Sequence, residues 1–318
     1  MGLATSLVEN ELASNSWVLT ALALLPAIIL CVYVFKKDRV EKEPLGLLLG
    51  LLALGALSCF PAGIVEGIVG DLIDAVFAPF GQAVTENGQD YVVFSSLFYH
   101  LYQGTSAFIG VALIEELGKW LVLILLTRKS KHFNSLFDGV IYAVFASLGF
   151  AALENVMYAF QYGLGTVLMR AVTSIPGHMF FGVFMGVYYS IWKVSTCAYE
   201  GEKQLAAKGT IRISRPINPN GGKWMSLLIP VLVHGFYDYC LFVGSTVLVI
   251  IFYIFLIAMY FVCFNRIRHF SKADHGIENY AAALVLAKYQ MQANGKSISD
   301  EDQVDAISTI IDNTANTN

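Results

Sequence analysis

Acidic and imidazole side chains lie inside stretches of this chain that are otherwise almost wholly apolar. They fall in four separate stretches, with a lysine and an asparagine beside them: Glu115, Glu116, Lys119, Glu154, Asn155, His178, His234 and Asp238. A charged side chain in the middle of a membrane helix costs roughly 2.5–3.5 kcal/mol, so residues of this kind mark functional sites. A glutamate can take a proton from water while imidazoles stabilise an oxyanion, which is the chemistry of hydrolysis. Two histidines and a carboxylate are also a common zinc-ligand set that leaves a position open for water.

The depth of these residues predicts that they form one site. At about 1.5 Å per residue, Glu115, Glu154, His178 and His234 lie roughly 15–24 Å from the predicted cytoplasmic ends of their helices. Four helices would therefore place ionisable groups in one layer near the middle of the membrane.

Spacing assigns partners within this layer. Glu115 and Lys119 are separated by four residues with the glutamate first, the favourable order for an ion pair on a helix. Glu116 is turned about 100° away from Glu115 and would be free for chemistry, with the reverse assignment of the two glutamates also open. Asp238 follows His234 by four residues and can fix its tautomer.

The elements that must position these residues are membrane helices. Of 318 residues, 56% are hydrophobic and 14% charged, with a mean hydropathy of +0.62, whereas soluble domains carry about 25% charged residues. An all-α, multi-spanning helical bundle is therefore predicted. Seven spans are expected, the first being an uncleaved span: 17–35, 45–69, 97–126, 138–161, 167–192, 224–244 and 246–265. Glu66 and Arg170 fall near span ends, where snorkelling to the interface is cheap. The five cysteines are interpreted as packing residues.

Basic residues alternate between the connections, which predicts the orientation. Lys and Arg gather in the segments 36–43, 127–137 and 193–223 and after residue 265, and are almost absent from the other connections. The amino terminus would lie outside and the carboxyl terminus in the cytoplasm. Residues 1–270 would form the bundle and 271–318 a cytoplasmic tail, with a short helix at 279–293 and disorder after Gly295. No motif for a nucleic acid partner is present.

The polar positions resemble the motifs of the PrsW family of intramembrane proteases. The family patterns EExxK, FxxxE(N), a lone histidine and HxxxD are matched in order by Glu115-Glu116 with Lys119, Phe150 with Glu154 and Asn155, His178, and His234 with Asp238. The resemblance covers about residues 110–265. Lys119 and Glu154 stand where the related CAAX prenyl endopeptidases of the CPBP group have other residues, which favours PrsW.

The resemblance implies hydrolysis of a peptide bond in a membrane-associated protein substrate, in the inner membrane of a bacterium and in stress signalling. Glu115, Glu116, His178 and His234 would be catalytic, supported by Lys119, Glu154, Asn155 and Asp238. The reaction could proceed with zinc, held by Glu154, His178 and His234, or with a glutamate-activated water alone. Three alternatives stay open: an ion- or proton-coupled transporter, since buried acids and histidines also mark ion pathways, a CAAX-type prenyl endopeptidase, and a non-catalytic binding protein of the same fold.

Overall fold

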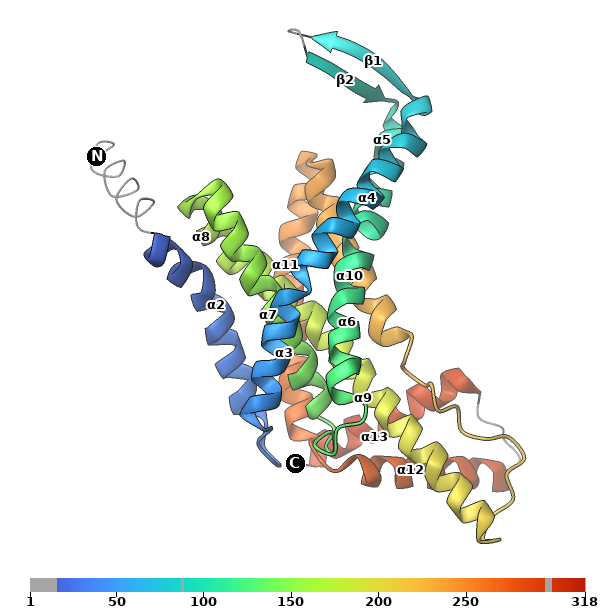
Figure 1. Ribbon diagram of the computed structural model, residues 1–318. Helices are drawn as coiled ribbons and strands as arrows, with labels where there is room; N and C mark the ends of the chain where they lie inside the picture. Colours follow the sequence, from blue (N-terminus) through green and yellow to red (C-terminus); the bar gives the residue numbers. More distant parts are fainter. Residues whose placement is uncertain (1–15, 87–88, 295–298, 318) are drawn as a thin grey trace.

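The computed structural model describes residues 16–86, 89–294 and 299–317. The described residues form helices and a single β-hairpin (Figure 1). The elements are α2 (Ser16–Lys37), α3 (Leu45–Leu57), α4 (Cys59–Phe77), the 3-10 turn η1 (Ala78–Phe80), β1 (Gly81–Glu86), β2 (Gln89–Phe94), α5 (Ser96–Thr105), the π-helical segment η2 (Ser106–Ala112), α6 (Leu113–Thr127), α7 (Asp138–Tyr162), α8 (Leu164–Val172), α9 (Ser174–Ala207), α10 (Met225–Val243), α11 (Thr246–Lys272), α12 (Ile277–Ala293) and α13 (Asp300–Thr317).

Helix α7 lies at the centre of the bundle and packs against α2, α3 and α9. Every residue from 138 to 151 is buried, which is expected of a helix that is apolar all round and enclosed by others. Glycines allow the close approach that membrane helices use for packing. A Cβ atom on Gly149 would stand 2.1 Å from the backbone oxygen of Leu52 in α3, and one on Gly186 of α9 would stand 2.5 Å from that of Gly139.

Six segments of the described chain are long and apolar enough to cross a membrane, which confirms the predicted class of fold. They are Ser16–Lys37, Leu45–Phe80, Asp138–Tyr162, Leu164–Ala207, Met225–Val243 and Thr246–Lys272. The third predicted span, 97–126, corresponds to α5, η2 and α6, which follow one another without a break from Ser96 to Thr127. This segment contains three charged residues, Glu115, Glu116 and Lys119, and is interrupted by the π-helical segment η2, and it is not one of the six. The number of seven spans and the orientation of the termini stay predictions.

The fifth predicted span is two helices rather than one. Gly163, with φ of 79°, ends α7 and begins α8, and α8 meets α9 at Thr173, whose φ and ψ are −116° and −70°. The short helix α8 therefore lies beside α2 and α7 before α9 starts (Figure 1). This arrangement decides where Arg170 points.

The two ends of the bundle carry different structures. The connection between the second and third predicted spans contains the antiparallel hairpin β1–β2, with register from Gly81↔Phe94 to Glu86↔Gln89, and it projects beyond α4 and α5 (Figure 1). At the other end, α12 packs on α9. Disorder was predicted after Gly295, but residues 300–317 form α13, which packs against α11 and α12 and buries Ile307 and Ile311. The two isoleucines are four residues apart, so one face of this acidic helix is apolar.

Candidate active site

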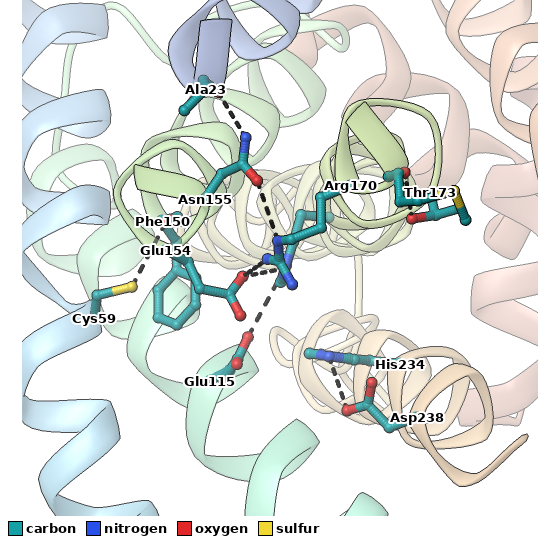
Figure 2. A network of polar contacts seen from close by, with 12 residues as sticks. Ala23, Cys59, Glu115, Phe150, Glu154, Asn155, Arg170, Thr173, His234 and Asp238 are labelled. Carbon is teal, nitrogen blue, oxygen red and sulfur yellow. Dashed lines mark hydrogen bonds and ion pairs between the residues drawn. The ribbon is translucent and has the colours of Figure 1, made fainter. Parts of the chain in front are cut away.

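The four predicted stretches come together at one cavity of about 450 Å³. Helix α6 supplies Glu115, α7 supplies Glu154, α9 supplies His178, and α10 supplies His234 and Asp238. Figure 2 shows Glu115, Glu154, His234 and Asp238 reaching from different helices into the same region. The predicted convergence of these side chains is therefore present in the structure.

The ammonium group of Lys119 lies at the centre of the cluster. Its Nζ atom is 3.0 Å from Glu115 Oε2, 2.7 Å from Glu116 Oε1 and 3.0 Å from His178 Nδ1. The side chain is fully buried and its Nζ also lies 4.2 Å from the centre of the Phe150 ring. An ammonium has three hydrogens and no acceptor. Each hydrogen is therefore donated to one of three different groups.

These contacts define the tautomer of His178. Because Lys119 can only donate, Nδ1 of His178 accepts, and the ring hydrogen is on Nε2. Nε2 donates to Glu154 Oε2 over 3.0 Å. The same oxygen accepts from Arg170 over 2.6 Å. The ring of His178 is thus held on both sides, by α6 and by α7.

A second set of hydrogen bonds ties the site to the surrounding helices. Arg170 Nε donates to Asn155 Oδ1 over 3.2 Å, and Asn155 Nδ2 donates to the backbone oxygen of Ala23 in α2 over 2.8 Å (Figure 2). The guanidinium of Arg170 also lies 4.0 Å from the centre of the Tyr158 ring. Asn155 therefore makes an interhelical contact, and α8 is attached to α7 through Arg170.

Glu115 and Glu116 differ in what they face. Glu116 is fully buried, and its Oε1 accepts from Lys119 and from His234 Nδ1, the latter over 2.9 Å. Glu115 lines the cavity. The interpretation that left Glu116 free is therefore replaced by the reverse assignment, in which Glu115 faces the space where a substrate would lie.

His234 is placed between two carboxylates. Its Nε2 is 3.2 Å from Asp238 Oδ2, so the predicted pair is present, although this oxygen makes no aligned hydrogen bond with a described residue. The ring stacks on Phe181 with centroids 4.5 Å apart and planes at 17°. This packing fixes the plane of the imidazole, with Nε2 next to Asp238, and both residues line the cavity.

Two residues that were predicted to reach outward near span ends line the cavity instead. Arg170 was expected to reach outward to the interface, but it points inward to Glu154. Glu66 of α4 also lines the cavity, and it makes no hydrogen bond or ion pair with any residue that the structure describes. The signal that could have found Arg170 is its position just before the Thr-Ser-Ile-Pro segment, where the helix changes direction.

The predicted zinc ligands are not the set that the structure groups. Among the described residues, the one group of three donors within 4.8 Å of each other is Glu115, Glu116 and His178, and these donor types are compatible with a metal. Lys119 Nζ, however, already uses a donor atom of all three. His178 accepts from Lys119 through Nδ1 and donates to Glu154 through Nε2, so it has no ring nitrogen left for a metal, and the three groups as arranged do not fit one.

The fold and the cavity define an integral membrane protein with a polar hydrolytic site enclosed by helices. The family model of PrsW intramembrane metalloproteases matches residues 43–264, so the chain belongs to this family and is an intramembrane protease. The match begins before the second predicted span, and thus extends well beyond the core of 110–265 expected from the motifs.

Curated relatives agree with this assignment. The chain is 29% identical over 253 residues to "Protease PrsW" of Clostridioides difficile (strain 630), covering 78% of this chain and 90% of that protein. It is 27% identical to "Protease PrsW" of Oceanobacillus iheyensis, with 76% and 91% covered, and 27% identical to that of Bacillus subtilis (strain 168), with 68% and 79% covered. No solved structure matches the chain.

Proposed function

We propose that Glu115 is the general base of this protease and that it acts on a water molecule in the cavity. The observation that carries the proposal is the contrast between the two glutamates. Glu116 is used by Lys119 and His234, whereas Glu115 is held by Lys119 through one oxygen and borders the cavity. A base must reach the proton that it removes, and only Glu115 of the two is placed to do so.

The proposed reaction is a base-catalysed hydrolysis. Glu115 takes a proton from water while the water oxygen attacks the peptide carbonyl carbon, which gives a tetrahedral oxyanion. The protonated Glu115 then gives that proton to the nitrogen as the C–N bond breaks, which leaves a carboxylic acid and an amine and restores the Glu115 carboxylate. His234 lies between the carboxylates of Glu116 and Asp238 and is proposed to be an imidazolium, whose Nδ1 donates to Glu116. Its Nε2 then also carries a hydrogen, lies 3.2 Å from Asp238 without an aligned hydrogen bond, and is the donor proposed for the oxyanion.

The other polar residues are proposed to hold these two groups in place. Lys119 keeps Glu115 and Glu116 together without metal, and Glu154 with Arg170 fixes the ring of His178. Zinc is not needed in this scheme because the ammonium already supplies the positive charge between the carboxylates. The substrate is proposed to be a membrane-spanning protein, and the location a bacterial inner membrane, which the bacterial relatives support.

The proposal is tested with the purified full chain in proteoliposomes and a fluorogenic single-span peptide. Glu115→Gln should lower the cleavage rate by about 10²–10⁴, the usual contribution of a general base. Glu278→Gln, an exposed glutamate on α12 outside the cavity, is the matched control and should cleave at the wild-type rate. Cleavage by Glu115→Gln at the rate of the control would refute the assignment.

A further inference from the structure

A second cavity lies at the end of α6, on the side of the bundle that is predicted to face the cytoplasm. It has a volume of about 590 Å³ and is formed by the turn after α6, the second half of α9 and the segment before α10. Its lining is basic and aromatic: Arg128, Lys129, Lys193, Tyr189, Trp192 and Tyr199. Glu115 and Arg128 are thirteen residues apart on one helix, so this basic cavity lies about 20 Å from the catalytic cluster.

The cations that line the basic cavity, and Lys223 beside it, have no ion-pair partner among the residues that the structure describes. These cations are Arg128, Lys129, Lys193 and Lys223. The one acid in the lining, Glu200, faces Lys203 at 3.7 Å.

At the same end of the protein, a buried lysine outside the basic cavity has an acidic partner. Lys288 is buried and forms an ion pair with the buried Glu202. The basic cavity thus has an excess of positive charge that a bound anion would compensate.

Aromatic rings hold these cations around the cavity. Arg128 Cζ and Lys223 Nζ lie 5.8 Å and 5.4 Å from the centre of the Trp192 ring, and Lys193 Nζ lies 4.9 Å from that of Phe133. Trp192 is only 7% exposed. A cation close to a ring face is attracted to it, so the charges are positioned by the buried wall.

An apolar strip leads from the membrane to the basic cavity. Leu121 and Leu125 are one turn apart on α6, and Arg128 and Lys129 follow at three and four residues, so all four share one face of the helix path. Leu121 is 45% and Leu125 79% exposed on the protein surface. Leu228 near the start of α10 is also exposed, at 49%. These side chains are suited to contact with acyl chains, whereas the adjoining cations are suited to a phosphate.

We propose that the basic cavity binds the phosphate-bearing headgroup of an anionic membrane lipid, whose acyl chains lie along Leu121 and Leu125. The phosphate is held by Arg128, Lys129 and Lys193, and Trp192 forms the wall of the headgroup site. The basic cavity differs from an ordinary basic surface because it is concave, has an aromatic wall, and adjoins the exposed leucines on the membrane side. A soluble phosphate has the same headgroup chemistry but cannot use the apolar strip.

The test measures lipid retention by the full chain with native mass spectrometry. Wild-type protein is released from nanodiscs of dioleoyl phosphatidylglycerol and phosphatidylcholine in equal amounts. One phosphatidylglycerol should be retained in preference to phosphatidylcholine. The variant R128Q/K129Q/K193Q should lose this preference by about tenfold or more, because each cation near an anionic headgroup strengthens binding severalfold. Lys193→Met alone should weaken it in the same direction and serves if the triple variant fails to fold.

The matched control removes three basic residues that lie at the same end of the bundle but outside the cavity. K36Q/R39Q/R268Q changes three exposed side chains and should retain the lipid as the wild type does. An equal loss in both variants would overturn the proposal, because the binding would then belong to the whole basic surface. Retention unchanged in the cavity variants would also overturn it. Displacement of the lipid by glycerol phosphate at equal concentration would show that the occupant is a soluble phosphate and not a lipid.

Discussion

Removing the Lys119 ammonium should destabilise the protein strongly, because two carboxylates and an imidazole depend on it. Its Nζ donates to Glu115, Glu116 and His178 over 2.7–3.0 Å, and the lysine side chain is fully buried. Taking one partner from a buried ion pair costs about 3–5 kcal/mol, because a buried charge is left without compensation. Lys119→Met keeps a similar apolar length and should lower the free energy of unfolding by about that amount.

The measurement is unfolding of purified protein by dodecyl sulfate in mixed micelles, followed by circular dichroism. A compensated variant provides the control: Glu115→Gln and Glu116→Gln added to Lys119→Met remove all three charges. Its stability should return to within about 2 kcal/mol of the wild type, as neutral replacement of buried pairs is often tolerated. It should still be inactive, since the base is missing. A Lys119→Met protein within about 1 kcal/mol of the wild type would refute the central placement of this lysine.

Three further perturbations test other parts of the molecule. Arg170→Gln should lower the turnover number about tenfold or more with little change in KM, because Glu154 then loses the partner that fixes it beside His178. Arg170→Lys should recover part of the rate. Equal rates for the wild type and both variants would contradict this role. Glu66 lines the cavity without a partner among the described residues. Glu66→Gln should therefore reduce cleavage of a peptide with a lysine beside the scissile bond about tenfold and leave cleavage of a neutral peptide unchanged. Equal effects on both peptides would contradict a role of Glu66 in binding that lysine. Burial raises the pKa of Asp38, in the turn between α2 and α3, from 3.8 to about 6. Its protonated form therefore stabilises the fold at low pH, and this contribution, at most about 3 kcal/mol, is lost as the pH rises from 4 to 6. Asp38→Asn should flatten the dependence of the free energy of unfolding on pH, and an unchanged slope would contradict this prediction.

Much of the site could be predicted from the sequence because membrane helices simplify the geometry. An ionisable residue in an apolar stretch must face other helices, and its depth follows from its distance to the helix end. This was enough to bring Glu115, Glu154, His178 and His234 to one layer. The pairing of His234 with Asp238 followed from a spacing of four residues.

The rotation of α6 could not be predicted in the same way. Glu115 and Glu116 are adjacent, so a small rotation of the helix exchanges which of them faces the cavity. The π-helical segment η2 lies directly before α6 and has a different number of residues per turn from an α-helix, which changes the rotation of α6. No motif in the sequence predicts this segment. The contact of Lys119 with both glutamates therefore became visible only in three dimensions.

Elements outside the site were missed for local reasons. Arg170 was placed near the end of a single long span, whereas the break at Thr173 turns α8 so that its basic residue points inward. The acidic composition after Gly295 concealed the apolar spacing of Ile307 and Ile311, which gives α13 a face to bury. In both cases packing against distant segments decided the outcome.

The most direct test of the account is the metal content of active protein. Lys119 lies between Glu115, Glu116 and His178, so the protein is expected to be active without zinc. Protein is treated with 1,10-phenanthroline, which is then removed, until it contains less than about 0.1 zinc per molecule. This protein should cleave the single-span peptide at the rate of untreated protein. One zinc per chain that is lost together with activity, and that restores activity when it is added back, would contradict the account.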